Sequence, residues 1–220
     1  MKKSFLVIGL GRFGSSVATT LAKSNCDVLA MDISEEAVAS VAKNVLHSVI
    51  ADSTKISVLE KLGAKNVDHA VVAIGNNLEA SILTIVNLKT IGVKKITVRA
   101  DNEKYKEIFM LIGATDVVVP EEDFGEAIGN QIKSDSILDY YLITDNHAMA
   151  QINVSRDFEG KNLKELDLRN EFSINIVGII RDEKFFIPLW SDTLNKGDVV
   201  VVAGKDKDIN KIDVFLNNYK

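Results

Sequence analysis

The sequence predicts an α/β protein in which a doubly wound, Rossmann-like parallel sheet is followed by a small α+β domain. Apolar runs typical of strands alternate with helical patterns over residues 1–120. These runs consist largely of Val, Ile, Leu and Ala, which is typical of parallel strands buried on both faces. After Pro120 the strand-like runs follow one another closely, which indicates a second domain. We therefore predict one domain over residues 1–134 and another over residues 135–220.

The predicted strands of the first domain cover residues 5–8, 28–31, 48–51, 70–74, 95–98 and 116–119. Helical periodicity between them predicts helices over residues 11–23, 54–62, 79–91 and 102–112, and one more that begins after Ser34. Ser34 is a suitable N-cap because its hydroxyl can accept a hydrogen bond from the first turn. Glu35 and Glu36 then complement the helix dipole.

The second domain is predicted to be smaller and to mix strands with helices. Strand patterns cover residues 140–143, 148–154, 176–180, 185–188 and 199–203, and helical patterns cover residues 162–168 and 208–216. Another helical pattern, over residues 122–134, leads up to this domain, and Ile128 and Ile132 fall on one face of that helix. At roughly 80 residues, this domain is smaller than a typical substrate domain of a dehydrogenase.

Composition and charge argue against several functional classes. The 220 residues include 26 Lys and Arg against 31 Asp and Glu, so the formal net charge is −5. An acidic chain without a basic run argues against nucleic acid as the main partner. The single cysteine excludes an intramolecular disulfide and fits a reducing cytoplasm. No apolar stretch approaches the roughly 20 residues needed to cross a bilayer, so we expect any membrane role to work through a partner.

A glycine-rich motif follows the first predicted strand and opens the first helix. Gly9, Gly11 and Gly14 form the pattern G-x-G-x-x-G. The first glycine makes a tight turn, the second lets the backbone approach a pyrophosphate, and the third lets helix and strand pack closely. Asp32 ends the second strand, about 20 residues after the motif, where a carboxylate binds ribose hydroxyls and disfavours the 2′-phosphate of NADP. The alternative is that Asp32 only starts a turn.

Other polar residues follow strand ends, where ligands of such sheets bind. Asp52 or Ser53 would face the adenine side of a nucleotide, and Arg99 would face its phosphates. The alternative for each is a solvated loop. Arg12 stands at a variable position of the glycine motif, and its guanidinium can bind an additional phosphate. This favours a triphosphate, or a diphosphate beside a neighbouring partner.

The sequence offers no catalytic constellation. Cys26 is expected to fill space in a helix-to-strand connection, and the three histidines share no metal-ligand spacing with one another or with cysteine. We therefore predict that the protein is not an enzyme. Residues 121–123 form an acidic run, which is typical of a helix N-terminus but can also hold a hard cation such as Mg²⁺ or Ca²⁺.

The segments around the glycine motif resemble those of a known family. The strings VIGLGRFG (residues 7–14), DI (32–33), VAIG (72–75) and RAD (99–101) are similar to the family that regulates potassium conductance (RCK), in its KtrA/TrkA type of cytosolic subunit. Residues 194–204 resemble part of the second domain of that family. The resemblance covers essentially the whole chain.

The resemblance implies a ring of Rossmann domains, an octamer built from homodimers, attached in the cytoplasm to a membrane potassium channel subunit of the KtrB/TrkH type. It also implies that ATP or ADP binds the glycine motif, that Arg12 reaches a γ-phosphate, and that Glu121 helps to hold a divalent cation at a dimer interface. NAD(H) binds many relatives at the same place. The residues implied in nucleotide binding are Gly9, Gly11, Arg12, Phe13, Gly14, Asp32, Ile33, Asp52, Ser53, Ala73, Ile74, Gly75 and Arg99.

A second ligand site is implied for the C-terminal domain. Relatives of this type bind cyclic di-AMP between two subunits, and the pattern falls on Arg169, Ile174, Asn175, Ile176 and Pro188. Residues 170–173 depart from the family pattern, which is more basic there and contains glycine. The alternative is a solvated arginine at a helix end beside ordinary core isoleucines.

The function predicted from the sequence is a nucleotide-gated regulatory subunit that controls potassium transport through a membrane channel. The alternatives are an NAD-dependent oxidoreductase and a redox-sensing transcription regulator that use the same pocket. The first would need a catalytic His, Lys or Tyr near the nicotinamide, and the second would need a basic helix-turn-helix. Neither feature is evident in the sequence.

Overall fold

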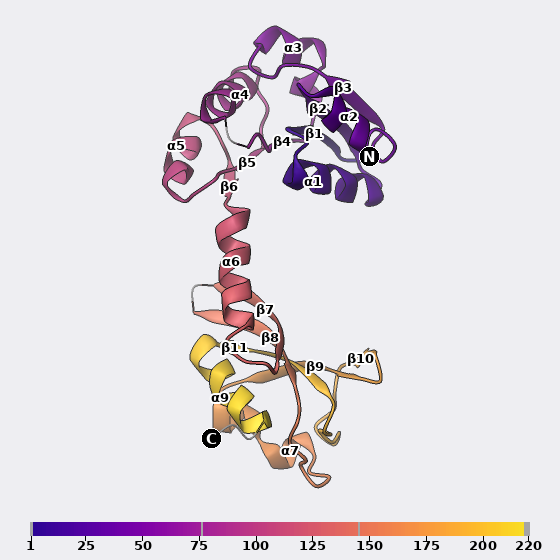
Figure 1. The fold of residues 1–220 in the computed structure, drawn as a ribbon, viewed down its shortest axis with the longest axis vertical. Coiled ribbons are helices and arrows are strands. Elements are labelled where there is room, and N and C mark those ends of the chain that lie inside the picture. The colour runs from indigo at the N-terminus through magenta and orange to yellow at the C-terminus, as the bar shows by residue number, and fades with distance from the viewer. Residues whose placement is uncertain (1, 76, 145, 218–220) are drawn as a thin grey trace. The chain divides into compact units, whose positions relative to one another are not determined.

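The computed structural model describes residues 2–75, 77–144 and 146–217. The chain divides into two compact units, Met1–Glu122 and Asp123–Lys220 (Figure 1). The division falls within helix α6 (Pro120–Gln131), and residue 134, where the sequence predicts the boundary, lies just beyond the end of this helix. Each unit has a buried core of its own.

A parallel sheet forms the centre of the first unit. Its strands are β1 (Ser4–Ile8), β2 (Asp27–Asp32), β3 (His47–Ile50), β4 (His69–Val72), β5 (Ile96–Arg99) and β6 (Asp116–Val118). They are ordered β3-β2-β1-β4-β5-β6, and all neighbouring strands are parallel. The predicted doubly wound sheet is therefore confirmed. The strand order reverses between β1 and β4, which is where such sheets bind ligands.

Helices accompany this sheet in the first unit. They are α1 (Arg12–Lys23), α2 (Glu35–Val41), α3 (Ile56–Lys61), α4 (Leu78–Thr90) and α5 (Lys104–Ile112), with an unpredicted 3₁₀ turn, η1 (Ala64–Asn66). Strand β1 shows why both faces of the sheet are apolar, because Val7 packs in one buried cluster while Leu6 and Ile8 pack in another. The predicted N-cap is confirmed, since the Ser34 hydroxyl accepts a hydrogen bond from the Ala37 amide.

The second unit contains a five-stranded antiparallel sheet, which confirms the predicted α+β domain. Its strands are β7 (Ile137–Thr144), β8 (His147–Asn153), β9 (Asn175–Arg181), β10 (Lys184–Phe186) and β11 (Val199–Lys205). They are ordered β10-β9-β11-β8-β7. Helix α9 (Asp206–Asn217) packs against β8 and β11 through buried residues that include Ile209 and Ile212.

Two predicted elements of the second unit were wrong in detail. The helix expected over residues 162–168 is instead two short helices, α7 (Leu163–Leu166) and α8 (Leu168–Phe172). They are separate because Asp167 between them adopts a left-handed conformation with φ of 43°. The strand expected over residues 185–188 ends at Phe186, before Pro188, which has no N–H to donate to a strand ladder.

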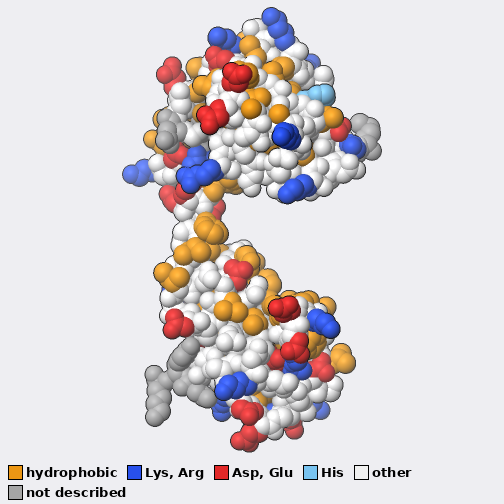
Figure 2. Space-filling view, turned by 45° about the vertical axis from the view of Figure 1, so that its right-hand side comes forward, with side chains coloured by type: hydrophobic (Ala, Val, Ile, Leu, Met, Phe, Trp, Pro, Cys, Tyr) orange, Lys and Arg blue, Asp and Glu red, His pale blue; other side chains and the backbone are white. Residues whose placement is uncertain are grey.

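Large apolar side chains are exposed along α6 (Figure 2). Phe124 and Ile128 of α6 and Ile132, the residue directly after its end, follow one another at four-residue spacing and are 69%, 37% and 75% exposed. Strand β7 also exposes apolar residues: Leu138, Tyr141, Leu142 and Ile143. Exposed apolar side chains that gather on one face are typical of an interaction surface. Within the described part of the chain, no helix combines the length and the hydropathy of a membrane span.

Candidate functional site

A cavity of about 740 Å³ opens at the carboxyl ends of the parallel strands in the first unit. This volume lies in the range of small-molecule and cofactor sites. The structure brings the following sequence-predicted residues together in its lining: Gly9, Gly11, Arg12, Phe13, Asp32, Ile33, Asp52, Ser53, Ala73, Ile74, Gly75, Arg99 and Glu121. Lining residues that the sequence did not single out are Ile8, Ala51, Thr54, Asn77 and Ala80.

The three glycines of the motif differ in their surroundings. Gly9 has a φ of +89°, and a Cβ there would lie 2.6 Å from the carbonyl carbon of Ala73. Gly14 does not line the cavity, but its Cβ would lie 1.8 Å from the carbonyl oxygen of Gly9. Gly11 has nothing within 4 Å of an added Cβ and does line the cavity. A side chain at Gly9 or Gly14 would therefore collide with the backbone, whereas Gly11 keeps space open for a ligand.

Helix α1 begins at this cavity. Its N-cap, Gly11, provides no side-chain cap, and the first turn contains no acidic residue. The first N–H groups of a helix lack partners within the helix and carry partial positive charge. The N-terminus of α1 is therefore available to bind a phosphate or another anion.

Asp32 ties the glycine loop to the turn after β2. Its Oδ2 accepts a hydrogen bond of 2.6 Å from the Leu10 amide, and its Oδ1 accepts one of 2.8 Å from the Ser34 amide. The carboxylate thus holds a turn, as one interpretation of the sequence expects. Each oxygen keeps a second lone pair that can accept a ribose hydroxyl, as the other interpretation expects.

The loop after β3 is fixed from two sides. Thr54 donates its amide and its hydroxyl to Asp52, at 3.0 and 2.6 Å, and these hydrogen bonds lower the pKa of Asp52. The Ser53 hydroxyl is buried and shares a 2.7 Å hydrogen bond with Thr84. Asn87 donates to the carbonyl oxygens of Ser53 and Thr54. The sequence did not reveal Thr84 and Asn87 of α4, which hold this loop in place.

Charged side chains gather where β5 and α6 meet the cavity. Arg99 Nη2 donates a 2.7 Å hydrogen bond to Glu121 Oε1, and Arg99 Nη1 lies 3.1 Å from Asp101 Oδ1. The hydrogen bond from Arg99 lowers the pKa of Glu121, and the charge of Arg12 adds to this effect. Arg12 itself makes no ion pair with any described residue. It is therefore available to a ligand phosphate.

The described residues of one chain do not by themselves fit a divalent cation. Glu121 is engaged by Arg99, and the described residues contain no group of three or more His, Cys, Asp or Glu side chains that could hold a metal ion. The role of Glu121 at a dimer interface stays a prediction.

The His69 Nε2 lies 2.9 Å from the Thr97 hydroxyl, and burial lowers the pKa of this histidine. His69 does not line the cavity.

A second, smaller pocket of about 110 Å³ lies in the second unit. All the residues that the sequence assigned to a cyclic dinucleotide line it: Arg169, Ile174, Asn175, Ile176 and Pro188. Leu163, Leu168, Leu189 and Trp190 also line it and were not predicted. Trp190 is 60% exposed and is the single tryptophan of the chain, two residues after Pro188. Its place so close to Pro188 could have indicated from the sequence that Trp190 lines this pocket.

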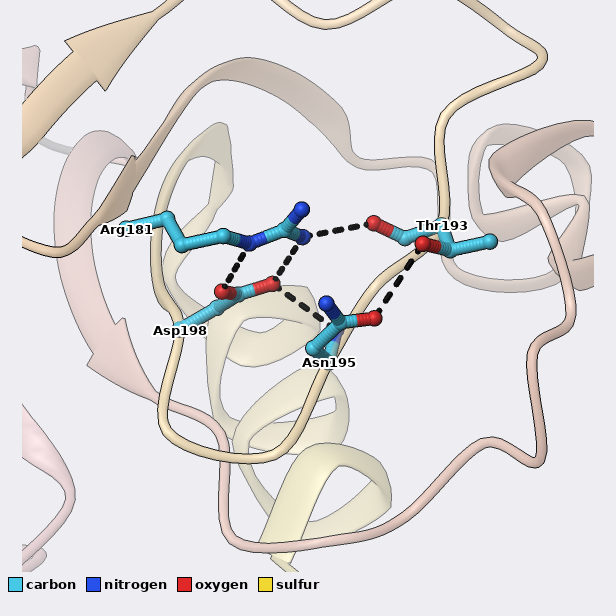
Figure 3. A network of polar contacts seen from close by, with 4 residues as sticks. All are labelled: Arg181, Thr193, Asn195 and Asp198. Carbon is cyan, nitrogen blue, oxygen red and sulfur yellow. Dashed lines mark hydrogen bonds and ion pairs between the residues drawn. The ribbon is translucent and has the colours of Figure 1, made fainter.

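A polar network closes the loop between β10 and β11, part of which lines the smaller pocket (Figure 3). Arg181 donates to both oxygens of Asp198, from Nε and Nη2, at 2.7 Å each. Arg181 Nη2 also donates to the Thr193 carbonyl at 2.9 Å. The backbone amide of Asn195 donates to Asp198 at 2.8 Å, and Asp198 is only 2% exposed. The network therefore fixes the shape of this loop.

Both units match known domain families. Residues 5–120 match the TrkA-N domain, and residues 148–217 match the TrkA-C domain. The chain is 42% identical to the Ktr system potassium uptake protein C of Bacillus subtilis (strain 168), over 97% of both chains. It is 33% identical to the Ktr system potassium uptake protein A of the same strain, over 96% of both chains.

Solved structures share the fold. The GsuK RCK domain aligns with a TM-score of 0.68 at 16% identity, over 98% of this chain and 48% of that one, so the present chain spans about half its length. The NAD(P)-binding domain of an exopolyphosphatase-related protein from Archaeoglobus fulgidus is 26% identical, with a TM-score of 0.53, over 60% of this chain and 98% of that one. With its TrkA-N domain, its TrkA-C domain and these Ktr relatives, the chain belongs to the RCK family.

Proposed function

We propose that this chain is a nucleotide-gated regulatory subunit of a potassium uptake system, acting on a separate membrane channel subunit of the KtrB/TrkH type. The observation that carries the proposal is the cavity of the first unit, where a glycine loop, a helix N-terminus, a carboxylate and two arginines converge. Similarity to two Ktr potassium uptake proteins supports the transport role and favours it over an oxidoreductase or a transcription regulator. In this proposal the chain is not an enzyme and works in the cytoplasm.

The cavity is proposed to hold ATP or ADP. The phosphates would lie against the N-terminus of α1, and the ribose hydroxyls would donate to Asp32. Ile33 is 75% exposed at the cavity and offers an apolar surface to the adenine ring. NAD(H) is a second candidate, because the Archaeoglobus fulgidus relative is described as an NAD(P)-binding domain. A GsuK channel, which shares the fold, has been solved bound to NAD.

The central test of the nucleotide site is Gly11→Ala. The added methyl group enters open space in the cavity, so the fold should survive while ATP, ADP and NADH bind at least about tenfold more weakly. Calorimetry measures the affinities, and thermal unfolding checks that the variant is folded. Wild-type affinity for all three ligands in folded Gly11→Ala would place the ligand elsewhere.

A second prediction concerns the terminal phosphate. Arg12 has no ion-pair partner among the described residues. Arg12→Ala should therefore weaken ATP binding by about 1–3 kcal/mol, because a charge-assisted contact is lost, and should weaken ADP binding by clearly less. Lys23→Ala is the matched control, because it removes the same charge from the last turn of α1. Equal losses for ATP and ADP in Arg12→Ala would show that the γ-phosphate lies away from this residue.

Assembly into homodimers and an octameric ring is part of the proposal. The exposed apolar residues of α6 support it, because a second copy of the chain would remove Phe124 and Ile128 from water. Mg²⁺ or Ca²⁺ would then reach Glu121 only together with groups from that second copy. Phe124→Asp should weaken this contact, and light scattering at equal protein concentration measures whether the assembly becomes smaller than that of the wild-type chain.

We also propose that the smaller pocket is half of a cyclic di-AMP site. A volume of about 110 Å³ is below the range of nucleotide-sized ligands, so one chain cannot enclose the ligand alone. Two copies related by a two-fold axis would bring two Arg169 side chains to the two phosphates, with Ile176 and Pro188 against the bases.

The prediction for this pocket uses Arg169→Ala. Loss of the guanidinium group in both copies should lower the affinity for cyclic di-AMP by at least about tenfold, while ATP binding stays at the wild-type level. Lys164→Ala in α7 is the control, because Lys164 is exposed and does not line the pocket. A wild-type chain without saturable micromolar binding of cyclic di-AMP would limit the second unit to dimerisation or another ligand.

A further inference from the structure

Arg99 connects the cavity with the start of α6. Its side chain is 14% exposed, lines the cavity, and is held by Glu121 on one amino group and by Asp101 on the other. Glu121 belongs to the first turn of α6. Arg99 Nε is buried and has no hydrogen-bond partner among the described side chains and backbone. The two carboxylates therefore leave this guanidinium incompletely satisfied.

The two members of the Arg99–Glu121 pair differ in their dependence on each other. The Glu121 side chain is 60% exposed, so water can replace Arg99 around its carboxylate at little cost. Arg99 is largely buried and needs an anionic partner. A terminal phosphate carries more charge than a carboxylate and offers three acceptor oxygens, so it competes well for the guanidinium. Arg12, Arg99 and Glu121 all line this one cavity, so a phosphate bound there is within the same site as all three groups.

We propose that Arg99 exchanges Glu121 for a nucleotide phosphate, so that ligand binding releases the first turn of α6. This inference rests on the proposed nucleotide site and states how ligand binding at that site affects helix α6. Helix α6 begins in the first unit and continues into the second. Release of its first turn would therefore change a helix that belongs to both units. Glu121 is thereby an internal competitor of the ligand, and Arg99 is the residue that both compete for.

The first experiment measures ATP binding to the full chain in EDTA, which removes any divalent cation. Glu121→Gln removes the competing charge and should tighten ATP binding by about tenfold. Glu122→Gln is the matched control, because it removes the same charge one residue along the same helix and Glu122 makes no ion pair with a described residue. We expect this control to change the affinity by less than about twofold. Equal effects of the two substitutions overturn the proposal.

A double-mutant cycle separates competition for Arg99 from simple repulsion of the ligand. In the Arg99→Ala background, Glu121→Gln should tighten ATP binding no more than Glu122→Gln does. An undiminished tenfold gain in that background overturns the proposal. A failure of the nucleotide site itself looks different, because the wild-type chain would then bind neither ATP, ADP nor NADH.

A second measurement needs no variant. The amides of residues 124–126 lie in the second turn of α6 and bond to carbonyl oxygens of its first turn. Saturating ATP in EDTA should speed their hydrogen exchange in the wild-type chain, because the first turn loses its attachment to Arg99. Unchanged or slower exchange at these amides, with ATP bound, overturns the proposal.

Discussion

Gly14→Ala is expected to destabilise the first unit by about 3 kcal/mol or more. The new Cβ would lie 1.8 Å from the carbonyl oxygen of Gly9 and 3.1 Å from the Cβ of Ala73. The nearer atom belongs to the backbone of the turn between β1 and α1, so no change of rotamer makes room for the methyl group. Helix α1 would have to move away from β1, and buried Ala18 would lose its packing. The gain in helix propensity, about 1 kcal/mol, does not offset this clash.

The matched control for Gly14→Ala lies three residues earlier. Gly11→Ala makes the same chemical change where nothing lies within 4 Å, so it should cost less than about 1 kcal/mol. Cys26 is the only cysteine and precedes β2 in the first unit, so its alkylation in a urea series reports on that unit. Trp190 is the only tryptophan, and its fluorescence reports on the second unit. If Cys26 of the Gly14→Ala variant became alkylated at the same urea concentration as in the wild-type chain, the packing role of Gly14 would be contradicted.

The fold of the first unit and most of the cavity lining could be predicted because their signals are local. Each strand is a short apolar run, and the glycine motif follows β1 directly. The requirement for Gly9 and Gly14 comes from a turn and a helix start within six residues of each other, which the motif itself encodes. Asp32 was found for the same reason, since it ends a recognisable strand.

Other features of the site depend on contacts between residues far apart in the chain. Thr84 reaches Ser53 across 31 residues, and nothing near either residue in the sequence indicates the partner. The pairing of Arg99 with Glu121 spans 22 residues and joins the end of β5 to the start of α6. A pattern can show that a polar side chain follows a strand, but only the packed fold shows which other side chain it meets.

The second unit was harder to predict in detail because its helices are short. A stretch of seven residues with helical spacing does not show that Asp167, near its end, is left-handed. The residues assigned to the smaller pocket came from a family resemblance and not from spacing. They nevertheless line one pocket, because α8, β9 and the loop after β10 bring them together.

Asp198→Ala is expected to destabilise the second unit by about 3 kcal/mol, since it breaks a buried ion pair by removing one partner. Asp198 is 2% exposed and accepts two hydrogen bonds from Arg181 and one from the Asn195 amide. Without it, the Thr193 carbonyl is the one remaining hydrogen-bond acceptor of Arg181 among the described residues, and the backbone amide of Asn195 loses its acceptor. Arg181 is 32% exposed, so water compensates part of the loss and keeps the effect at the lower end of the usual range.

The same substitution should loosen the loop between β10 and β11 before the unit unfolds. Trp190 lies on this loop, so its fluorescence in urea follows both the loop and the second unit. Asp192→Ala is the matched control, because this carboxylate lies in the same loop but accepts only the Leu189 amide, and its loss should cost about 1 kcal/mol. Arg181→Met combined with Asp198→Ala should recover part of the stability, because no unpaired guanidinium then remains beside the core. If the double variant is less stable than Asp198→Ala alone, Arg181 stabilises the loop through Thr193 and not through the ion pair.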